Sequence, residues 1–321
     1  MRLLKFYPKA DLGLYILNNM TKIVVTHDLG LSEDDKKRLK SLGDVTIYDS
    51  RPKSPEEWLE RCNGADIICS GIPGLREKYQ ELKNVFITLP LVNVAYLNIE
   101  TLNKNNIKVS NSPGCNKDAV SEWIVGMMIN LLRKLPFYIN NNDLPKDKAP
   151  EQAIGLTDKM VLILGKGNTG NRVGEICKSL KMNVTFFERG DDLNKKIKNK
   201  SVIVNCLSTN KTSLGILDEK FFNSLDRNTY FISVSSNEIY DSEAMFKALD
   251  NGILNGAAID DGTMNVGNTS DSYYQRLLKH PKILATPHIA YNSDISNKEG
   301  NRIMIDNIEA YLANKPIHLI N

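Results

Sequence analysis

Short apolar runs alternate with amphipathic stretches along most of the 321-residue chain. The runs are rich in Val, Ile and Leu, as buried strands are, and the stretches between them carry apolar residues at helical spacing. This alternation predicts an α/β protein with parallel sheets. We expect strands over residues 23–26, 45–48, 65–69, 85–88, 107–111, 160–164, 184–187, 201–206, 230–234, 256–260 and 283–286. We expect helices near residues 33–41, 55–62, 119–135 and 293–312.

Residues 160–188 combine these elements with a glycine turn. An apolar strand leads directly into Gly165-Lys166-Gly167-Asn168-Thr169-Gly170, and a helical stretch and a second strand follow. In a dinucleotide-binding turn the first glycine permits the bend, the second lets a pyrophosphate approach, and the third lets helix and strand pack closely. The phosphates then lie on the amides of a helix N-terminus. The glycines alone are a weak signal, but the flanking elements complete the context that the motif requires.

Glu188 ends the second strand, where an acid can hydrogen-bond both ribose hydroxyls of the cofactor. Its negative charge disfavours a 2′-phosphate, so the sequence predicts NAD as the cofactor. Arg189 follows directly and could accept such a phosphate, which leaves NADP as the alternative.

Charge and cysteine content narrow the class of protein. The 41 Lys and Arg residues nearly balance the 38 Asp and Glu residues, so no basic nucleic-acid footprint is present. We expect no membrane segment, because no apolar run has spanning length and the first residues do not form a signal peptide. The cysteines (Cys62, Cys69, Cys115, Cys177 and Cys206) contain no C-x-x-C pair and lie mostly in apolar contexts. They predict buried free thiols in a reducing cytoplasm, with no metal site.

The late position of the glycine turn indicates the domain organisation. A smaller strand–helix domain comes first, and a loop rich in Asn, Pro, Asp and Lys at residues 140–150 separates it from the turn. We therefore expect a cofactor domain over residues 117–290, inserted into a substrate domain made of residues 20–116 and 291–321. Residues 1–19 are expected to be an extension, and their role stays open.

Five pieces of sequence, in order, carry a family resemblance. They are residues 111–116 (NSPGCN) with 119–122 (AVSE), the glycine turn, residues 207–215, residues 256–260 (GAAID) and residues 286–290 (TPHIA). Together they resemble the D-isomer-specific 2-hydroxyacid dehydrogenase family, from about residue 21 to the C-terminus. The resemblance implies two Rossmann-like, doubly wound parallel-sheet domains, with the NAD-binding domain inserted into a flavodoxin-like substrate/catalytic domain.

The same resemblance assigns the catalytic positions. It implies that a histidine takes the hydroxyl proton while hydride leaves for the nicotinamide, and His288 matches that histidine. It also implies an arginine that holds the substrate carboxylate just after the strand at 230–234. Ser236 stands at that position, and no arginine lies nearby that could replace it.

The family's glutamate, which orients the histidine, belongs three residues beyond Asp260. Thr263 occupies that position, so two of the three catalytic positions are changed. Asp261 could replace the glutamate if the chain bends it inward; otherwise it is a solvent-facing aspartate. Asp260 itself is implied to lie near the nicotinamide carboxamide.

The remaining ligand contacts follow from the resemblance as well. The cofactor-binding residues are expected to be Gly165, Gly167, Asn168, Thr169, Gly170, Glu188, Arg189, Leu207, Ser208, Val234, Asp260 and His288. Many relatives have an arginine at the position of Asn168, so cofactor affinity is expected to be lower here. The substrate loop is expected at Leu91, Val92 and Asn93, where Pro90 removes one backbone amide and Asn93 offers a side-chain donor.

Two functions fit these observations. The first is an NAD-dependent oxidoreductase that acts on a small hydroxy or oxo acid or a related carbonyl compound, with His288 as acid and base. The second is a catalytically weak NAD(H)-binding relative that acts as a ligand-responsive partner protein. In both cases the resemblance implies a homodimer through the helix at 119–135. Its apolar face is expected to comprise Trp123, Met127, Met128 and Leu131. The alternative is that this helix belongs to an interdomain core, and both roles can hold.

Overall fold

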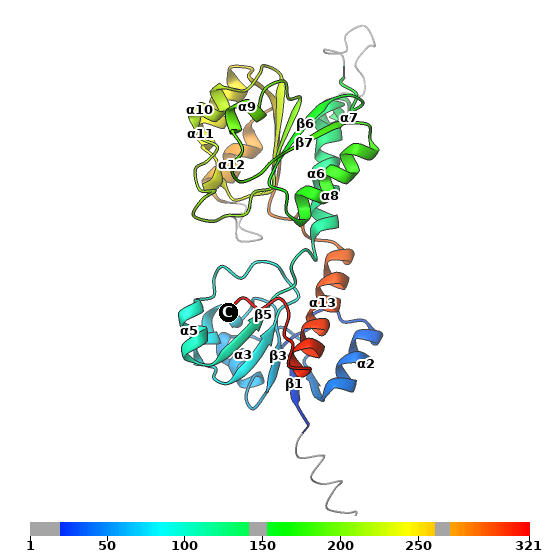
Figure 1. Ribbon diagram of the computed structural model, residues 1–321, viewed down its shortest axis with the longest axis vertical. Coiled ribbons are helices and arrows are strands. Elements are labelled where there is room, and N and C mark those ends of the chain that lie inside the picture. The colour runs from blue at the N-terminus through cyan, green and yellow to red at the C-terminus, as the bar shows by residue number, and fades with distance from the viewer. Residues whose placement is uncertain (1–19, 141–152, 261–269) are drawn as a thin grey trace, which may run out of the picture. The chain divides into compact units, whose positions relative to one another are not determined.

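The computed structural model describes residues 20–140, 153–260 and 270–321, and the chain contacts divide it into two compact units (Figure 1). Within the described residues, the first unit runs to Asn116 and resumes at Ser293, and the second unit spans Lys117–Asn292. The second unit therefore lies, in sequence, between two segments of the first.

The first unit contains a five-stranded parallel sheet with the order β2-β1-β3-β4-β5. Its strands are β1 (Lys22–Val25), β2 (Asp44–Ile47), β3 (Ile67–Cys69), β4 (Val85–Thr88) and β5 (Ile107–Ser110). Its helices are α2 (Glu33–Leu42), α3 (Pro55–Arg61), α4 (Leu75–Lys78), α5 (Ile99–Lys104) and α13 (Asp294–Leu312), with the 3-10 turn η1 (Tyr79–Glu81). This strand order is that of flavodoxin-like folds.

Both faces of this sheet are buried, which explains why its strands read as continuous apolar runs. Ile68 and Ile87 pack with Trp58 on one face, whereas the neighbouring residues Ile67 and Phe86 pack on the other face, against α13. The C-terminal residues then cover the edge strand β5, where Ile320 N donates to Val109 O at 2.9 Å. An edge strand paired in this way does not offer free backbone groups to another chain.

The second unit contains a six-stranded parallel sheet with the order β11-β10-β9-β8-β6-β7. Its strands are β6 (Met160–Leu164), β7 (Asn183–Phe187), β8 (Val202–Asn205), β9 (Thr229–Ser233), β10 (Leu254–Asp260) and β11 (Ile283–Thr286). Its helices are α6 (Lys117–Leu132), α7 (Leu135–Asn140), α8 (Asn168–Ser179), α9 (Leu193–Lys196), α10 (Glu219–Asn223), α11 (Ser242–Asp250) and α12 (Ser272–Lys279), with the 3-10 turn η3 (Asn237–Ile239). The predicted α/β fold with two parallel-sheet domains is confirmed.

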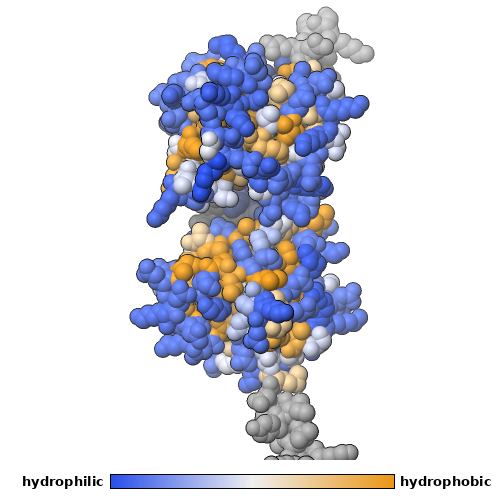
Figure 2. Space-filling model, viewed as in Figure 1, coloured by the Kyte–Doolittle hydropathy of each residue, from blue (hydrophilic) through white to orange (hydrophobic). Residues whose placement is uncertain are grey.

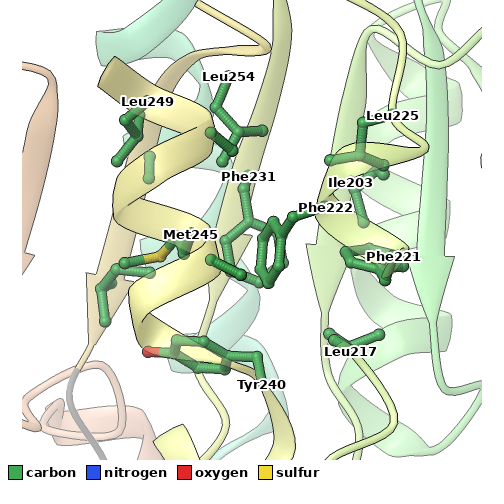
Figure 3. Packing of buried hydrophobic residues seen from close by; sticks show 14 of the residues in the cluster. Ile203, Leu217, Phe221, Phe222, Leu225, Phe231, Tyr240, Met245, Leu249 and Leu254 are labelled. Carbon is green, nitrogen blue, oxygen red and sulfur yellow. The ribbon is translucent and has the colours of Figure 1, made fainter. Parts of the chain in front are cut away.

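Helices cover both faces of the second sheet. On one face, Phe222 of α10 packs edge to face on Phe231 of β9, with ring centroids 5.5 Å apart, and Met245 of α11 lies beside them (Figure 3). On the other face, Ile124 of α6 and Val173 of α8 pack over the sheet. Aromatic pairs of this geometry stabilise a core beyond their buried area.

The long helix is shorter than predicted. We expected a helix over residues 119–135, but α6 ends at Leu132, and a separate helix begins at Leu135. Lys134 between them has a left-handed φ of 53°, and Pro136 follows, which could not donate to the carbonyl of Leu132 in a continuous helix. That carbonyl instead accepts a 2.8 Å hydrogen bond from Ile154 N.

Candidate cofactor and catalytic site

The glycine turn after β6 is shaped by close packing. Gly165 has a φ of 94°, and a Cβ atom there would lie 3.1 Å from the carbonyl oxygen of Cys206, after β8. A Cβ on Gly170 would lie 2.0 Å from the carbonyl oxygen of Gly165, so only glycine fits at that position. A Cβ on Gly167 would meet no protein atom within 4 Å. Packing therefore requires the first and third glycines, whereas the second keeps the backbone open to a ligand.

The turn ends at the N-terminus of α8, which carries the amides of Asn168 and Thr169. Gly167 is the N-cap residue and has no side chain, so it gives the first-turn amides no side-chain acceptor. A helix N-terminus of this kind attracts phosphate through its amides and its dipole. The chain passes from β6 out to β7 and returns to β8, so the turn also lies where the strand order reverses, as expected for a dinucleotide site.

Glu188 lies directly after β7 and is half exposed. Its Oε1 atom accepts a hydrogen bond from Lys166 Nζ at 3.1 Å, which forms an ion pair inside the predicted cofactor site. Arg189 is exposed, and its Nη2 atom lies 3.4 Å from Thr212 Oγ1. Sequence reasoning did not single out Lys166, although its place between the first two glycines of the turn was a usable signal.

The loops after β8 and β9 are tied together beside the turn. Asn205 Oδ1 accepts from Leu207 N at 3.2 Å, and its carbonyl oxygen accepts from Val234 N at 3.3 Å. Ser235 Oγ donates to the carbonyl of Leu207 at 2.8 Å, and Ser208 O accepts from Ser213 Oγ at 2.7 Å. Leu207, Ser208 and Val234 thus follow the carboxyl ends of the neighbouring strands β8 and β9, and the backbone of Leu207 lies close to Gly165.

Asp260, at the end of β10, anchors the segment that carries His288. Its Oδ1 atom accepts from Thr286 Oγ1 at 2.6 Å and from Ile289 N at 2.9 Å, and its Oδ2 atom accepts from Ala290 N at 2.9 Å. Asp260 is only 3% exposed, so it is a buried carboxylate with charge-assisted hydrogen bonds on both sides of His288. His288 itself has a left-handed φ of 54°.

The imidazole of His288 is half-buried and packs edge to face against the ring of Tyr291, with centroids 5.5 Å apart. Within residues 20–140, 153–260 and 270–321, no carboxylate is hydrogen-bonded to this imidazole. Asp261 and Thr263, the predicted partner and the changed glutamate position, lie outside the described residues. The carboxylate that does act on this segment, Asp260, holds its backbone.

Ser236, at the position of the family arginine, is used locally. Its hydroxyl accepts a hydrogen bond from Glu238 N at 3.3 Å and caps η3, and it lies 3.4 Å from Glu238 Oε2. Glu238 is exposed. The position that would carry a cation in the family therefore has a neutral hydroxyl with a carboxylate beside it.

The predicted substrate loop lies in the first unit, after β4. Leu91 O accepts from Ser112 N at 2.9 Å, and Val92 O accepts from Asn111 Nδ2 at 2.7 Å. Asn93 Oδ1 accepts from Ala95 N at 3.0 Å. The Nδ2 group of Asn93 is the side-chain donor that was predicted for this loop. The side chain of Val92 is exposed, and Figure 2 shows an apolar area on the visible face of this unit.

Sequence reasoning also missed a buried histidine in the first unit. His27 follows β1, where the order of this sheet reverses between β1 and β3, and it is 5% exposed. Its Nδ1 atom lies 3.0 Å from Thr26 Oγ1. Burial lowers the pKa of His27, and the charges of Arg51 and Arg61 lower it further, against a smaller opposite effect of Asp28. Its place at the carboxyl end of the first strand could have indicated it.

The cysteines are free, and four of the five are buried, as predicted. Burial, with a smaller contribution from the neighbouring Cys177, raises the pKa of Cys206, which follows β8, to about 12. A thiol with such a pKa carries almost no thiolate at neutral pH and is a poor nucleophile. Within the described part of the chain, no group of His, Cys, Asp or Glu side chains could hold a metal ion. No helix in that part is long and apolar enough to cross a membrane.

Comparison with known proteins gives a family-model match that covers this region. Residues 125–290, more than half of the chain, match the family model described as "D-isomer specific 2-hydroxyacid dehydrogenase, NAD binding domain". The matched range contains the glycine turn, Glu188, Asp260 and His288.

Individual relatives agree with this match. The chain is 27% identical to D-lactate/D-glycerate dehydrogenase of Pediococcus acidilactici over 65% of this chain and 70% of that protein. It is 25% identical to D-3-phosphoglycerate dehydrogenase of Methanocaldococcus jannaschii over 91% of this chain, but only 58% of that protein. Its fold resembles an acyclic imino acid reductase in complex with NADPH and D-Arg (TM-score 0.79, 22% identity, 94% of this chain and 100% of that one). It also resembles a D-lactate dehydrogenase of Treponema pallidum (TM-score 0.77, 19% identity, 94% and 100%).

Proposed function

This chain belongs to the D-isomer-specific 2-hydroxyacid dehydrogenase family, and from that premise we propose that it interconverts a small 2-hydroxy acid, or a related alcohol, with its carbonyl form. The predicted family, nicotinamide cofactor and oxidoreductase class are confirmed by the family match and the relatives. When bound, the nicotinamide supplies the hydride for reduction or accepts it on oxidation. His288 gives a proton to the carbonyl oxygen on reduction and takes it from the hydroxyl on oxidation.

The observation that carries this proposal is the anchored segment around His288. Asp260 binds Thr286 on one side of the histidine and the amides of Ile289 and Ala290 on the other. A buried carboxylate with three hydrogen bonds holds the backbone in a left-handed turn that few residues adopt. Such pre-organisation is expected of a general acid and base, which must be positioned before its pKa matters.

The cofactor-holding residues follow from the glycine turn. We infer that the pyrophosphate lies against Gly167 and the amides of Asn168 and Thr169, since no protein atom would meet a Cβ at Gly167. The carboxylate of Glu188 would accept hydrogen bonds from the ribose hydroxyls. This arrangement favours NAD as the cofactor.

The substrate side supports a second candidate, a catalytically weak NAD(H)-binding relative with a regulatory role. Ser236 and Glu238 offer a hydroxyl and a negative charge where a substrate carboxylate would need a cation. Losing both hydrogen bonds of an arginine, each worth about 1.5–3 kcal/mol, would weaken carboxylate recognition by at least about a hundredfold. We place this candidate second, because the hydrogen bonds of Asp260 hold the segment that carries His288 in place.

The other parts of the proposal concern the first unit and the assembly. We assign the first unit to substrate binding, with Leu91, Val92 and Asn93 as the contact loop. We also propose a homodimer through α6, with a reducing cytoplasm as its location because its free thiols are buried. Met128 is completely buried in its own unit, so the proposed dimer contacts on α6 are Trp123, Met127 and Leu131. A monomer mass by light scattering at micromolar concentration would contradict the dimer.

A screen of purified protein with NADH tests the proposed function. The substrates are 2-oxo acids, aldehydes and ketones, and the variant is His288→Asn, because asparagine tolerates a positive φ and removes the acid–base group. We expect NADH oxidation with at least one compound and a loss of about 10²–10⁴-fold in the variant. NADH binding without any turnover would favour the second candidate. Absence of NADH binding would exclude both.

A further inference from the structure

The ion pair between Lys166 and Glu188 changes the cofactor preference that Glu188 alone would impose. We propose that Lys166 lets this site bind a 2′-phosphorylated nicotinamide dinucleotide as well as the unphosphorylated one. The inference rests on the proposed function, because it takes Glu188 to lie at the ribose. It makes Lys166 a residue that determines cofactor specificity.

The ammonium group of Lys166 lies at the carboxylate of Glu188. Lys166 lies between Gly165 and Gly167 in the turn, and its Nζ atom is 3.1 Å from Glu188 Oε1. The same Nζ atom lies 5.7 Å from the centroid of the Phe186 ring, within the range of a cation–π contact. The turn after β6 and the end of β7 thus bring a positive charge directly to the carboxylate that should exclude a phosphate.

Both side chains of this ion pair are about half exposed to solvent. The side chains of Lys166 and Glu188 are 46% and 53% exposed. Ion pairs in water at a protein surface are weak. A phosphate dianion carries more charge than a carboxylate and offers three acceptor oxygens, so it can take Lys166 as its partner. A ribose hydroxyl can instead donate to Glu188 while the ion pair stays in place.

The charged residues that follow Glu188 in the sequence add to the positive charge near the site. Arg189 follows Glu188 and adds a second exposed cation. The next acid, Asp191, accepts from Glu188 N at 2.8 Å and is paired with Lys196 at 3.2 Å. Lys166 therefore pairs with Glu188, Lys196 pairs with Asp191, and the cation of Arg189 comes in addition to these two pairs. This additional positive charge offsets the repulsion of a 2′-phosphate.

Binding titrations with NADH and NADPH, followed by nucleotide fluorescence, test the inference without requiring turnover. For the wild-type protein, we expect dissociation constants that differ by no more than about tenfold. Lys166→Gln should weaken NADPH binding by about tenfold or more and change NADH binding by less than about threefold. The matched control is Lys247→Gln, because Lys247 is also exposed and pairs with Glu219 at 3.4 Å on another face of the same unit. It should change neither constant.

Two further measurements keep the test decisive if Lys166→Gln folds poorly. In the wild-type protein, NADPH binding should weaken more steeply with added salt than NADH binding, because it uses one more charge contact. Glu188→Gln should tighten NADPH binding and weaken NADH binding. The inference is wrong if wild-type NADPH binding is over about a hundredfold weaker than NADH binding, or if Lys166→Gln weakens both equally. If neither nucleotide binds, the proposed function fails together with the inference.

Discussion

The glycine turn after β6 and the loop after β9 lie at the same edge of the same sheet, but packing constrains them differently. A side chain at Gly170 would collide with the backbone of Gly165, so the fold itself requires glycine there. Ser236 lies in a half-buried loop and contacts mainly Glu238 in its own turn. A residue at that position can change without disturbing the core.

This difference shows why a fold and its chemistry need not persist together. The first and third glycines of the turn, Gly165 and Gly170, are needed for packing whether or not a cofactor binds. A substrate-binding arginine contributes to catalysis alone, so its loss costs the fold nothing. Gly165 and Gly170 therefore indicate the fold, the open backbone at Gly167 indicates a ligand, and neither indicates a particular reaction.

The largest effect is expected from changing Gly170, which packing requires, and Gly167, which keeps the backbone open to a ligand. Gly170→Ala should destabilise the second unit by about 3 kcal/mol, because backbone atoms must move to admit the Cβ. NADH binding should be lost with it. Gly167→Ala is the matched change, since its Cβ would meet no protein atom and its φ of −79° suits alanine. It should fold normally and bind NADH at least about tenfold more weakly.

Urea unfolding and NADH titration of both glycine variants separate folding from binding. If Gly167→Ala bound NADH like the wild-type protein, the pyrophosphate would not lie against that residue. If Gly170→Ala were as stable as the wild-type protein, the turn would be more adaptable than its packing indicates.

Asp260→Asn should have the next largest effect. The amide has one acceptor oxygen, so at least one of the three donors around His288 would lose its partner, at a cost of about 1–3 kcal/mol. We expect a lower urea midpoint and a fall in any His288-dependent turnover. Asp250→Asn is the control, because Asp250 is exposed and pairs with His280. Equal stability of the two variants would show that Asp260 does not anchor the segment.

Restoring the arginine at Ser236 should have a smaller but gain-of-function effect. Ser236→Arg removes the cap of η3 and places a guanidinium at the position where the resemblance implies a carboxylate-binding arginine. We expect kcat/KM for 2-oxo acids to rise by about tenfold, with little change for aldehydes that lack a carboxylate. Steady-state kinetics on matched acid and aldehyde pairs measures the difference. An equal change for both substrates would show that the arginine does not bind the carboxylate here.

The fold was largely predictable from the sequence, because each buried parallel strand is a continuous apolar run. The strands at 85–88, 160–164 and 283–286 have the predicted bounds. The glycine turn was predictable for a related reason, since helix and strand can approach closely only at a residue without a side chain. The end of α6 was missed, because the periodicity of its apolar residues continues past the left-handed Lys134.

The details of the site depended on contacts between distant segments. The ion pair between Lys166 and Glu188 joins two strand ends, and the hydrogen bonds of Asp260 reach the loop after another strand. No local pattern in the sequence encodes either contact. The resemblance implies that Asp260 lies near the nicotinamide carboxamide, which stays a prediction, and the structure adds its three hydrogen bonds to the segment around His288.

The two points of strand-order reversal offer the last and smallest test. The one in the second unit carries glycines, whereas the one in the first unit carries the buried His27. Because the pKa of His27 is lowered on folding, the unfolded chain binds its proton more tightly than the native protein. Stability should therefore fall as the pH drops below the ordinary value of 6.5, and the loss is complete below the folded-state pKa.

His27→Gln should remove this dependence, because glutamine keeps a polar side chain that does not titrate. In a Trp123→Phe background, Trp58 is the remaining tryptophan and reports on the first unit. Between pH 7.5 and pH 5.5, the urea midpoint should fall further for the histidine form than for the glutamine form, by about a few tenths of a molar. Parallel falls in the two forms would assign the acid sensitivity of this unit to groups other than His27. In that case, the charges of Arg51 and Arg61 would have no measurable effect on the stability of the first unit through the pKa of His27.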